Sequence, residues 1–223
     1  SRIKLECKDM KKLTIDFVSD VMCPWCTLGL RALEQAVDHL SDELSVDIHF
    51  RPFELNPDAP KEGLLVFENQ QRKYGLSKQQ VLANYANITE RGKALGFTFN
   101  MEKRSHYYNT FDAHRLLHWA ARSGKQLALK HALISAYFTD GKNVSDHAVL
   151  SELAVGVGLD AEEARAVLGS DRYAAEVRES QAKYRQLGIQ SVPSMIINGQ
   201  YLVTGSQPVS GYEQILRDIA KKV

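Results

Sequence analysis

The chain has 223 residues, of which 44% are hydrophobic and 25% are charged, and its formal net charge at neutral pH is +1. This composition excludes a disordered chain and is sufficient for one large domain, or for one domain that carries an inserted one. The charges form no long block of one sign, which argues against a nucleic acid or an anionic membrane surface as partner. No apolar run approaches the roughly 18 residues of a membrane span.

Residues 1–9, SRIKLECKD, are charged and lack the apolar core of a secretion signal. Met10, followed by KKLTIDF, is typical of a natural start. We therefore expect residues 1–9 to be a leader that is foreign or unstructured, whose Cys7 has no chemical role. We also expect the protein to be cytoplasmic.

The first structural half is predicted over residues 10–60. Apolar and polar residues alternate over residues 13–18 and again over 46–51, a pattern that predicts two half-buried strands. Between these stretches, apolar residues recur on one helical face: Leu28, Ala32, Leu33, Ala36, Val37 and Leu40. The order strand, helix, strand predicts a right-handed crossover with the second strand parallel to the first.

Residues 61–170 are predicted to form an all-helical insertion. Ser77 with Gln80, and Asp160 with Glu163, have the spacing of capping boxes. Residues 109–112, NTFD, are typical of a capped helix start, and the helix that follows is expected to end near Gly124.

The second half is predicted over residues 171–223. A polar-rich helix over 171–188 leads back to the sheet, and the segment VPSMIINGQYLVTG over 192–205 predicts two more strands. Asn198-Gly199 between apolar runs indicates a type I′ hairpin turn, since both central residues of that turn need positive φ. A last amphipathic helix follows Pro208. The β-α-β and β-β-α halves are therefore expected to share one four-stranded sheet.

The segment SDVMCPWCTLG over residues 19–29 carries the candidate chemistry. Two cysteines at this spacing have three interpretations: a redox couple, half of a metal site, or two neighbouring core residues. Zinc needs four ligands, and the chain has neither a fourth thiol nor a His pair on the same predicted helix as the cysteines. We therefore favour the redox couple and expect no metal.

The predicted helix start gives the two thiols different roles. Pro24 suits the first helical turn, where its missing N–H would have no partner. Cys23, just ahead of it, meets the free N–H groups and positive partial charge of the helix N-terminus, so we expect an ionised, solvent-open thiolate that attacks first. Cys26, one turn further and more enclosed, is expected to resolve a mixed disulfide.

Four further residues lead to open alternatives. Pro193 begins the predicted third strand, and a cis Val192–Pro193 bond would leave the backbone groups of Val192 free to pair with an extended substrate; an ordinary strand-start proline is the alternative. Trp25 either contacts substrate or fills the shape of its loop. His114 and His118 either line the site from the insertion or, as we favour, are ordinary packed or polar-face residues.

With these features the sequence resembles the DsbA-like group of thioredoxin-fold proteins, and within it the FrnE-like branch, which is related to 2-hydroxychromene-2-carboxylate isomerases and kappa-class glutathione transferases. The resemblance rests on SDVMCPWCTLG, RPFELNPD (51–58), NTFDAHRLLHWA (109–120) and GIQSVPSMIINGQYLVTGSQP (188–208). It implies a thioredoxin fold with a helical insertion, catalytic Cys23 and Cys26, and a cis Pro193 facing them. The candidate substrate-binding residues are Pro24, Trp25, Val192 and Pro193.

Three hypotheses about function follow. The first is a thiol-disulfide oxidoreductase or disulfide isomerase that acts on protein or small-molecule thiols and disulfides, with glutathione as a co-substrate and no tightly bound cofactor. The second is a glutathione-dependent isomerase or transferase of a small aromatic compound, although those branches commonly have serine at the position of Cys23. The third is a chaperone-like binding module without redox turnover. Since this chain has both thiols, the first is favoured. The sequence leaves both a monomer and a homodimer open.

Overall fold

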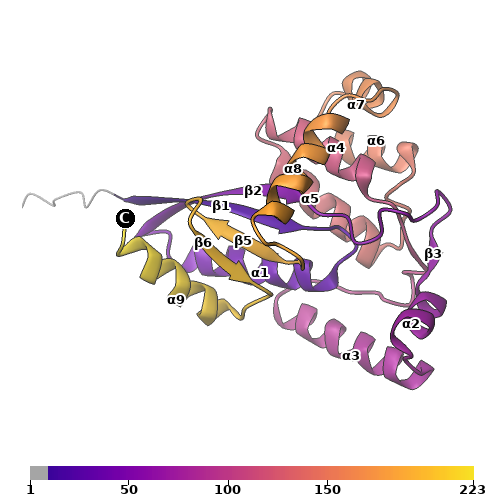
Figure 1. Ribbon diagram of the computed structural model, residues 1–223, viewed down its shortest axis with the longest axis horizontal. Helices are drawn as coiled ribbons and strands as arrows, with labels where there is room; N and C mark the ends of the chain where they lie inside the picture. The colour runs from indigo at the N-terminus through magenta and orange to yellow at the C-terminus, as the bar shows by residue number, and fades with distance from the viewer. Residues whose placement is uncertain (1–9) are drawn as a thin grey trace, which may run out of the picture.

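The computed structural model describes residues 10–223, so the predictions for residues 1–9 and Cys7 lie outside the described part. The elements in chain order are β1 (Lys11–Ser19), α1 (Pro24–His39), β2 (Leu44–Pro52), β3 (Leu64–Leu65), α2 (Val66–Tyr74), α3 (Lys78–Ala94), β4 (His106–Tyr107), α4 (Phe111–Ala121), α5 (Gln126–Ile134), the π-helical turn η1 (Ser135–Thr139), α6 (His147–Gly156), α7 (Ala161–Leu168), α8 (Ala174–Gln186), β5 (Ser194–Ile197), β6 (Tyr201–Thr204) and α9 (Val209–Ala220) (Figure 1).

One four-stranded sheet joins the two ends of the chain, in the order β2-β1-β5-β6. β2 is parallel to β1, while β5 is antiparallel to both of its neighbours. In β1, Phe17 lies opposite Phe50 of β2 and opposite Met195 of β5, and all three side chains are buried. The predicted α/β fold, with its two halves on one sheet, is confirmed.

The β5–β6 hairpin has the predicted turn. Asn198 and Gly199 both have positive φ, at 51° and 67°, and the Gln200 N–H donates to the Ile197 carbonyl at 3.1 Å. The Asn198 side chain also accepts from the backbone N–H of Thr14 at 2.8 Å. The turn is thus tied to β1, which fixes the register of the strand that follows Pro193.

Helices cover the sheet from two directions (Figure 1). The helices α1 and α9 run side by side along one face, where Leu33 and Tyr212 are buried in the main hydrophobic core. The helices α4, α5 and α8 contact β2 at the far edge of the sheet. The loop before α1 lies close to the segment that follows β2, because the Leu55 N–H donates to the Asp20 carboxylate at 2.8 Å.

The segment between β2 and α8 is mainly helical, as predicted, with one difference. Leu64 and Leu65 of β3 pair antiparallel with His106 and Tyr107 of β4. A ladder of two residues per strand has no room for the alternation by which a strand is recognised in a sequence. The boundaries 61–170 for an inserted domain stay a prediction.

The predicted helix caps are largely confirmed. Ser77 and Gln80 form a reciprocal capping box at the start of α3. Asp160 caps α7 by accepting from the N–H groups of Glu162 and Glu163. At the start of α4, the Asn109 side chain accepts from the Phe111 N–H at 2.9 Å, so the cap comes from one residue earlier than the N-cap position.

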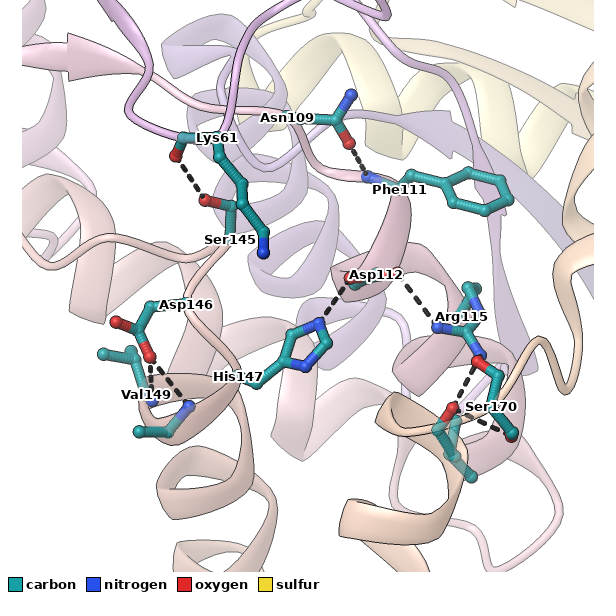
Figure 2. A network of polar contacts seen from close by, with 12 residues as sticks. Lys61, Asn109, Phe111, Asp112, Arg115, Ser145, Asp146, His147, Val149 and Ser170 are labelled. Carbon is teal, nitrogen blue, oxygen red and sulfur yellow. Dashed lines mark hydrogen bonds and ion pairs between the residues drawn. The ribbon is translucent and has the colours of Figure 1, made fainter.

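A buried arginine fixes α4 against α7 (Figure 2). Arg115 donates to the carbonyls of Val167 and Ser170, at 2.6 and 2.5 Å, and to Asp112 at 2.9 Å. Asp112 also pairs with His147 at the start of α6. Because α4 carries His114, this network also positions a residue that reaches the cysteine loop.

The part of the chain that the structure describes has no helix that is both long enough and apolar enough to cross a bilayer.

Candidate functional site

Cys23 is the N-cap residue of α1. Its backbone is extended, with φ −93° and ψ 113°, and Pro24 is the first helical residue. The Cys23 sulfur accepts from the Cys26 N–H at 3.3 Å, while the Cys23 N–H donates to the Asp20 carbonyl at 3.2 Å. The structure therefore places Cys23 where the sequence predicts it, at the helix start, with a backbone N–H of the first turn directed at its sulfur.

The two thiols differ in acidity in the direction that the sequence predicts. A hydrogen bond from the Cys26 thiol and the Cys26 backbone N–H lower the pKa of Cys23 below its ordinary value, although burial opposes this shift. Burial raises the pKa of Cys26 well above its ordinary value, and the hydrogen bond to Cys23 and the charge of the Cys23 thiolate add to the effect. Cys23 is therefore the sulfur that ionises first.

The expectation of a solvent-open Cys23 is wrong. Only 6% of its surface is exposed, compared with 2% for Cys26. The loop that carries Pro193 packs against α1 at Gly29, and Met22 beside Cys23 is also buried. Cys23 is nevertheless reachable, because it lines a cavity of about 550 Å³ between the α1 N-terminus, α2 and α3. Access to the sulfur is thus through a pocket instead of from an open surface.

The Val192–Pro193 bond is cis. The Cys23 thiol lies 3.8 Å from the Val192 carbonyl oxygen and is placed to donate to it. Among the described residues, no backbone N–H donates to that carbonyl. The loop can approach because residue 29 is glycine: a Cβ there would lie 3.3 Å from the Pro193 ring and 3.2 Å from the Tyr212 hydroxyl.

Trp25 is 40% exposed beside Cys23 and lines the same cavity. The guanidinium of Arg91 in α3 lies 5.5 Å from the centre of its ring. Pro24 also lines the cavity. The structure therefore brings the predicted residues Cys23, Pro24 and Trp25 to one wall.

Behind the cysteines lies a set of buried charged residues that sequence reasoning missed. One oxygen of the Asp20 carboxylate lies 3.1 Å from His114 Nε2, and the other accepts from the Leu55 N–H at 2.8 Å. Burial opposes ionisation of Asp20, yet the hydrogen bond and charge of His114 outweigh it and lower the Asp20 pKa. Lys130 Nζ donates to Ser19 Oγ at 2.9 Å. Burial lowers the pKa of Lys130, against the opposing charges of Cys26 and Asp20.

The two histidines that the sequence analysis considered, His114 and His118, have different surroundings. His114 is buried and binds Asp20 instead of facing Cys23. The ring of His118 packs against the Tyr173 ring, with 5.2 Å between the ring centres, and lines a different cavity, of about 330 Å³. Both histidines are therefore packed residues, and neither lines the cavity that contains Cys23. Within residues 10–223 no three His, Cys, Asp or Glu side chains lie close enough together to hold a metal ion.

The comparisons with known proteins match this geometry. Residues 14–217 match the model of the DSBA-like thioredoxin domain. The chain belongs to the DsbA-like thioredoxin family. A structure from Streptomyces coelicolor, described as a probable DsbA oxidoreductase, is 37% identical to this family member, with a TM-score of 0.88 over 94% of this chain and 90% of that chain.

Two more distant structures share the DsbA-like fold alone. The cytosolic disulfide reductase DsbM from Pseudomonas aeruginosa, solved with GSH, is 16% identical, with a TM-score of 0.62 over 93% of this chain and 99% of that chain. A 2-hydroxychromene-2-carboxylate isomerase is 12% identical, with a TM-score of 0.65 over 94% and 97%. The predicted resemblance to DsbA-like proteins and to the isomerase fold is confirmed.

The pKa difference between the two thiols leads to a testable pH profile. Iodoacetamide should alkylate Cys23 of the reduced protein with a midpoint below the pKa of a free cysteine, about 8.5. The alkylation midpoint follows the thiolate fraction, so the lowered pKa of Cys23 moves it to lower pH. Cys26 should stay unmodified over the same range. Peptide mass spectrometry against pH, with free glutathione as reference, measures both; a Cys23 midpoint at or above the reference would contradict the assignment.

Proposed function

We propose that this protein is a thiol-disulfide oxidoreductase whose redox pair is Cys23 and Cys26. The observation that carries the proposal is the position of the Cys23 sulfur. It accepts from the Cys26 N–H at the start of α1, has a lowered pKa, and lines a cavity large enough for a substrate. A thiolate of this kind is the nucleophile in disulfide exchange.

In the reducing direction, the Cys23 thiolate attacks one sulfur of a substrate disulfide. A mixed disulfide forms, and the other substrate sulfur leaves as a thiolate that takes up a proton. Cys26 then loses its proton and attacks the Cys23 sulfur, which releases the second substrate thiolate and forms the Cys23–Cys26 disulfide. Two electrons pass from the protein to the substrate, and an external thiol such as glutathione restores the pair.

In the oxidising direction the same bonds form and break in reverse. A substrate thiolate attacks the Cys23 sulfur of the Cys23–Cys26 disulfide, and Cys26 leaves as a thiolate. A second substrate thiolate then releases Cys23, with two electrons gained by the protein. Isomerisation of a protein disulfide uses the mixed disulfide without net transfer of electrons.

The remaining predicted residues hold the substrate in this proposal. The Val192 carbonyl, to which no backbone N–H of the described residues donates, accepts a backbone N–H from an extended chain next to Cys23, and Pro193 shapes that surface. Trp25 and Pro24 supply an apolar contact at the cavity wall. We further propose that the protein belongs to the FrnE-like branch and acts in the cytoplasm. Glutathione is the proposed co-substrate, and the reaction needs no tightly bound cofactor.

The test is reduction of insulin disulfides in the presence of glutathione, together with reshuffling of a scrambled protein. Wild type and Cys7→Ser should be equally active, because Cys7→Ser leaves the pair intact. Cys23→Ser should retain no activity above the uncatalysed rate. Equal rates for Cys23→Ser and wild type would refute the proposal.

The cavity beside Cys23 also favours a second candidate, a glutathione-dependent isomerase or transferase of a small molecule. Its volume of about 550 Å³ is within the range of small-molecule sites. In that case the thiol of bound glutathione supplies the nucleophile and Cys26 has no chemical step. Activity on a small aromatic substrate that needs glutathione and survives Cys26→Ser would favour this candidate over disulfide exchange.

A further inference from the structure

Arg104 is a buried cation in the wall of the cavity that contains Cys23. It lies between α3 and β4, where 5% of its surface is exposed. The centres of three aromatic rings lie within 6 Å of its guanidinium carbon: Tyr85 at 5.3 Å, Tyr107 at 5.5 Å and Phe138 at 5.7 Å. These rings hold the guanidinium through cation–π contacts and leave its N–H groups to be satisfied elsewhere.

Within residues 10–223 Arg104 has no anionic partner. No carboxylate forms an ion pair with its side chain, and its buried Nε has no acceptor. A buried guanidinium is normally paired, because removing it from water without hydrogen bonds is costly. The contrast with Arg115 is clear, since that buried arginine donates to three carbonyls and a carboxylate.

Another residue that lines the same cavity also has a buried polar atom without a partner. One end of the Gln70 amide binds the Tyr107 hydroxyl at 2.8 Å, while the other end, Oε1, is buried and unpaired. Both Gln70 and Arg104 line the cavity that includes Cys23. Arg104 needs an acceptor and Gln70 Oε1 needs a donor, so a ligand that satisfies both carries an acceptor such as a carboxylate together with an N–H or O–H group.

The charge of the cavity indicates the sign of that ligand. Lys73 and Arg104 both line it, and no Asp or Glu does so among the described residues. The other polar lining residues are mostly neutral amides and phenols: Asn56, Asn69, Gln70, Asn84, Asn87, Tyr85 and Tyr107. A positively charged, amide-rich pocket of this size fits a small anion better than a neutral or cationic molecule.

We propose that Arg104 binds a carboxylate of a small disulfide or thiol substrate and so directs the sulfur of that substrate toward Cys23. The planar guanidinium matches a carboxylate, to which it donates two parallel N–H bonds. The substrate class is a low-molecular-weight disulfide of the amino-acid or short-peptide type that carries a carboxylate. The inference rests on the proposed disulfide exchange and specifies the substrate of that same site.

The test uses three small disulfides that differ in charge: 3,3′-dithiodipropionate, its neutral bis-amide, and cationic cystamine. Each is mixed with excess pre-reduced protein, and the rate at which the reduced protein is converted to its mixed disulfide or to the Cys23–Cys26 disulfide is measured by mass spectrometry. Dividing each rate by the rate of the same disulfide with dithiothreitol removes intrinsic differences in reactivity. Wild type should prefer the dicarboxylate over the bis-amide by about tenfold or more, as expected for a charge-assisted pair of N–H bonds.

Variants identify the residue responsible. In Arg104→Gln the preference should fall to about twofold or less. Arg178→Gln is the matched control, because Arg178 also lies over an aromatic ring, Phe111 at 4.5 Å, but does not line this cavity; it should keep the full preference. If Arg104→Gln does not fold, Arg104→Lys decides instead: it keeps the charge but not the paired N–H geometry, so its preference should lie below that of wild type.

Three results would overturn the inference while the proposed function stands: no preference in wild type, full preference in Arg104→Gln or in Arg104→Lys, or loss of preference in Lys73→Gln but not in Arg104→Gln. A different result would refute the proposed function itself. In that case the reduced protein reacts with none of the three disulfides although dithiothreitol does.

Discussion

Replacing Cys26 with serine should stop turnover and leave the protein joined to its substrate through Cys23. The variant keeps the attacking thiolate, so the first exchange proceeds, but no second sulfur lies one turn along α1 to release the product. With glutathione disulfide as substrate, nearly every molecule should carry one glutathione on Cys23. Intact mass spectrometry under non-reducing conditions measures the adduct, and insulin reduction measures the loss of turnover.

Two matched variants make this result specific. Cys23→Ser should form no adduct, because the raised pKa and burial of Cys26 leave it unreactive. Cys7→Ser should behave as wild type. If Cys26→Ser turned over disulfides at the wild-type rate, the two-thiol mechanism would be wrong, and the glutathione-dependent isomerase would become the better candidate.

The sheet and the cysteine pair could be predicted because each leaves a local pattern. Alternation over 13–18 and 46–51 requires one buried face, and that face is the one on which Phe17 and Phe50 meet. Asn198-Gly199 is favourable in few conformations other than the hairpin turn that it adopts. The spacing of Cys23, Pro24 and Cys26 identifies a helix start, from which the direction of the Cys23 pKa follows.

Local patterns could not predict the residues that surround the cysteines, because those residues come from segments far apart in the sequence. Asp20 lies within the quoted motif, yet an aspartate before a helix is ordinarily an exposed residue, and its partner His114 comes from α4. Lys130 looks like a solvent-facing residue of α5 but is buried against Ser19. The burial of Cys23 arises in the same way, since the loop of Pro193 that lies near it is 170 residues away.

The aromatic cage of Arg104 shows the same limit. Its three rings come from α3, β4 and η1, and no local spacing relates them. The π-helical turn η1 is of a kind that often occurs at functional sites, but it cannot be recognised without the structure. Sequence reasoning therefore located the reactive sulfur, with Pro24 and Trp25 beside it, and left the rest of the cavity wall unassigned.

Removing the Asp20 carboxylate should be among the most destabilising single substitutions near the site. In Asp20→Ala, the Leu55 N–H and His114 Nε2 both lose a buried acceptor, so the free energy of unfolding should fall by about 3 kcal/mol. Asp42→Ala is the matched control, because Asp42 is exposed, and should change it by less than about 0.5 kcal/mol. Urea denaturation at neutral pH measures both, and equal stability of the two variants would contradict the role given to Asp20.

Asp20→Asn separates the charge of this residue from its hydrogen bonds. The amide oxygen can still accept from Leu55, so the loss of stability should be smaller than in Asp20→Ala. The pKa of Cys23 should fall further, because the Asp20 charge raises it in the wild type. The folded-state pKa of Asp20 lies below its unfolded value of about 3.9, so its stabilising contribution is present above that value and is lost as the pH falls through the folded-state pKa. The difference in free energy of unfolding between wild type and Asp20→Asn should therefore be largest at neutral pH and should disappear in acid. A difference that stays constant down to acid pH would show that the charge of Asp20 is not its cause.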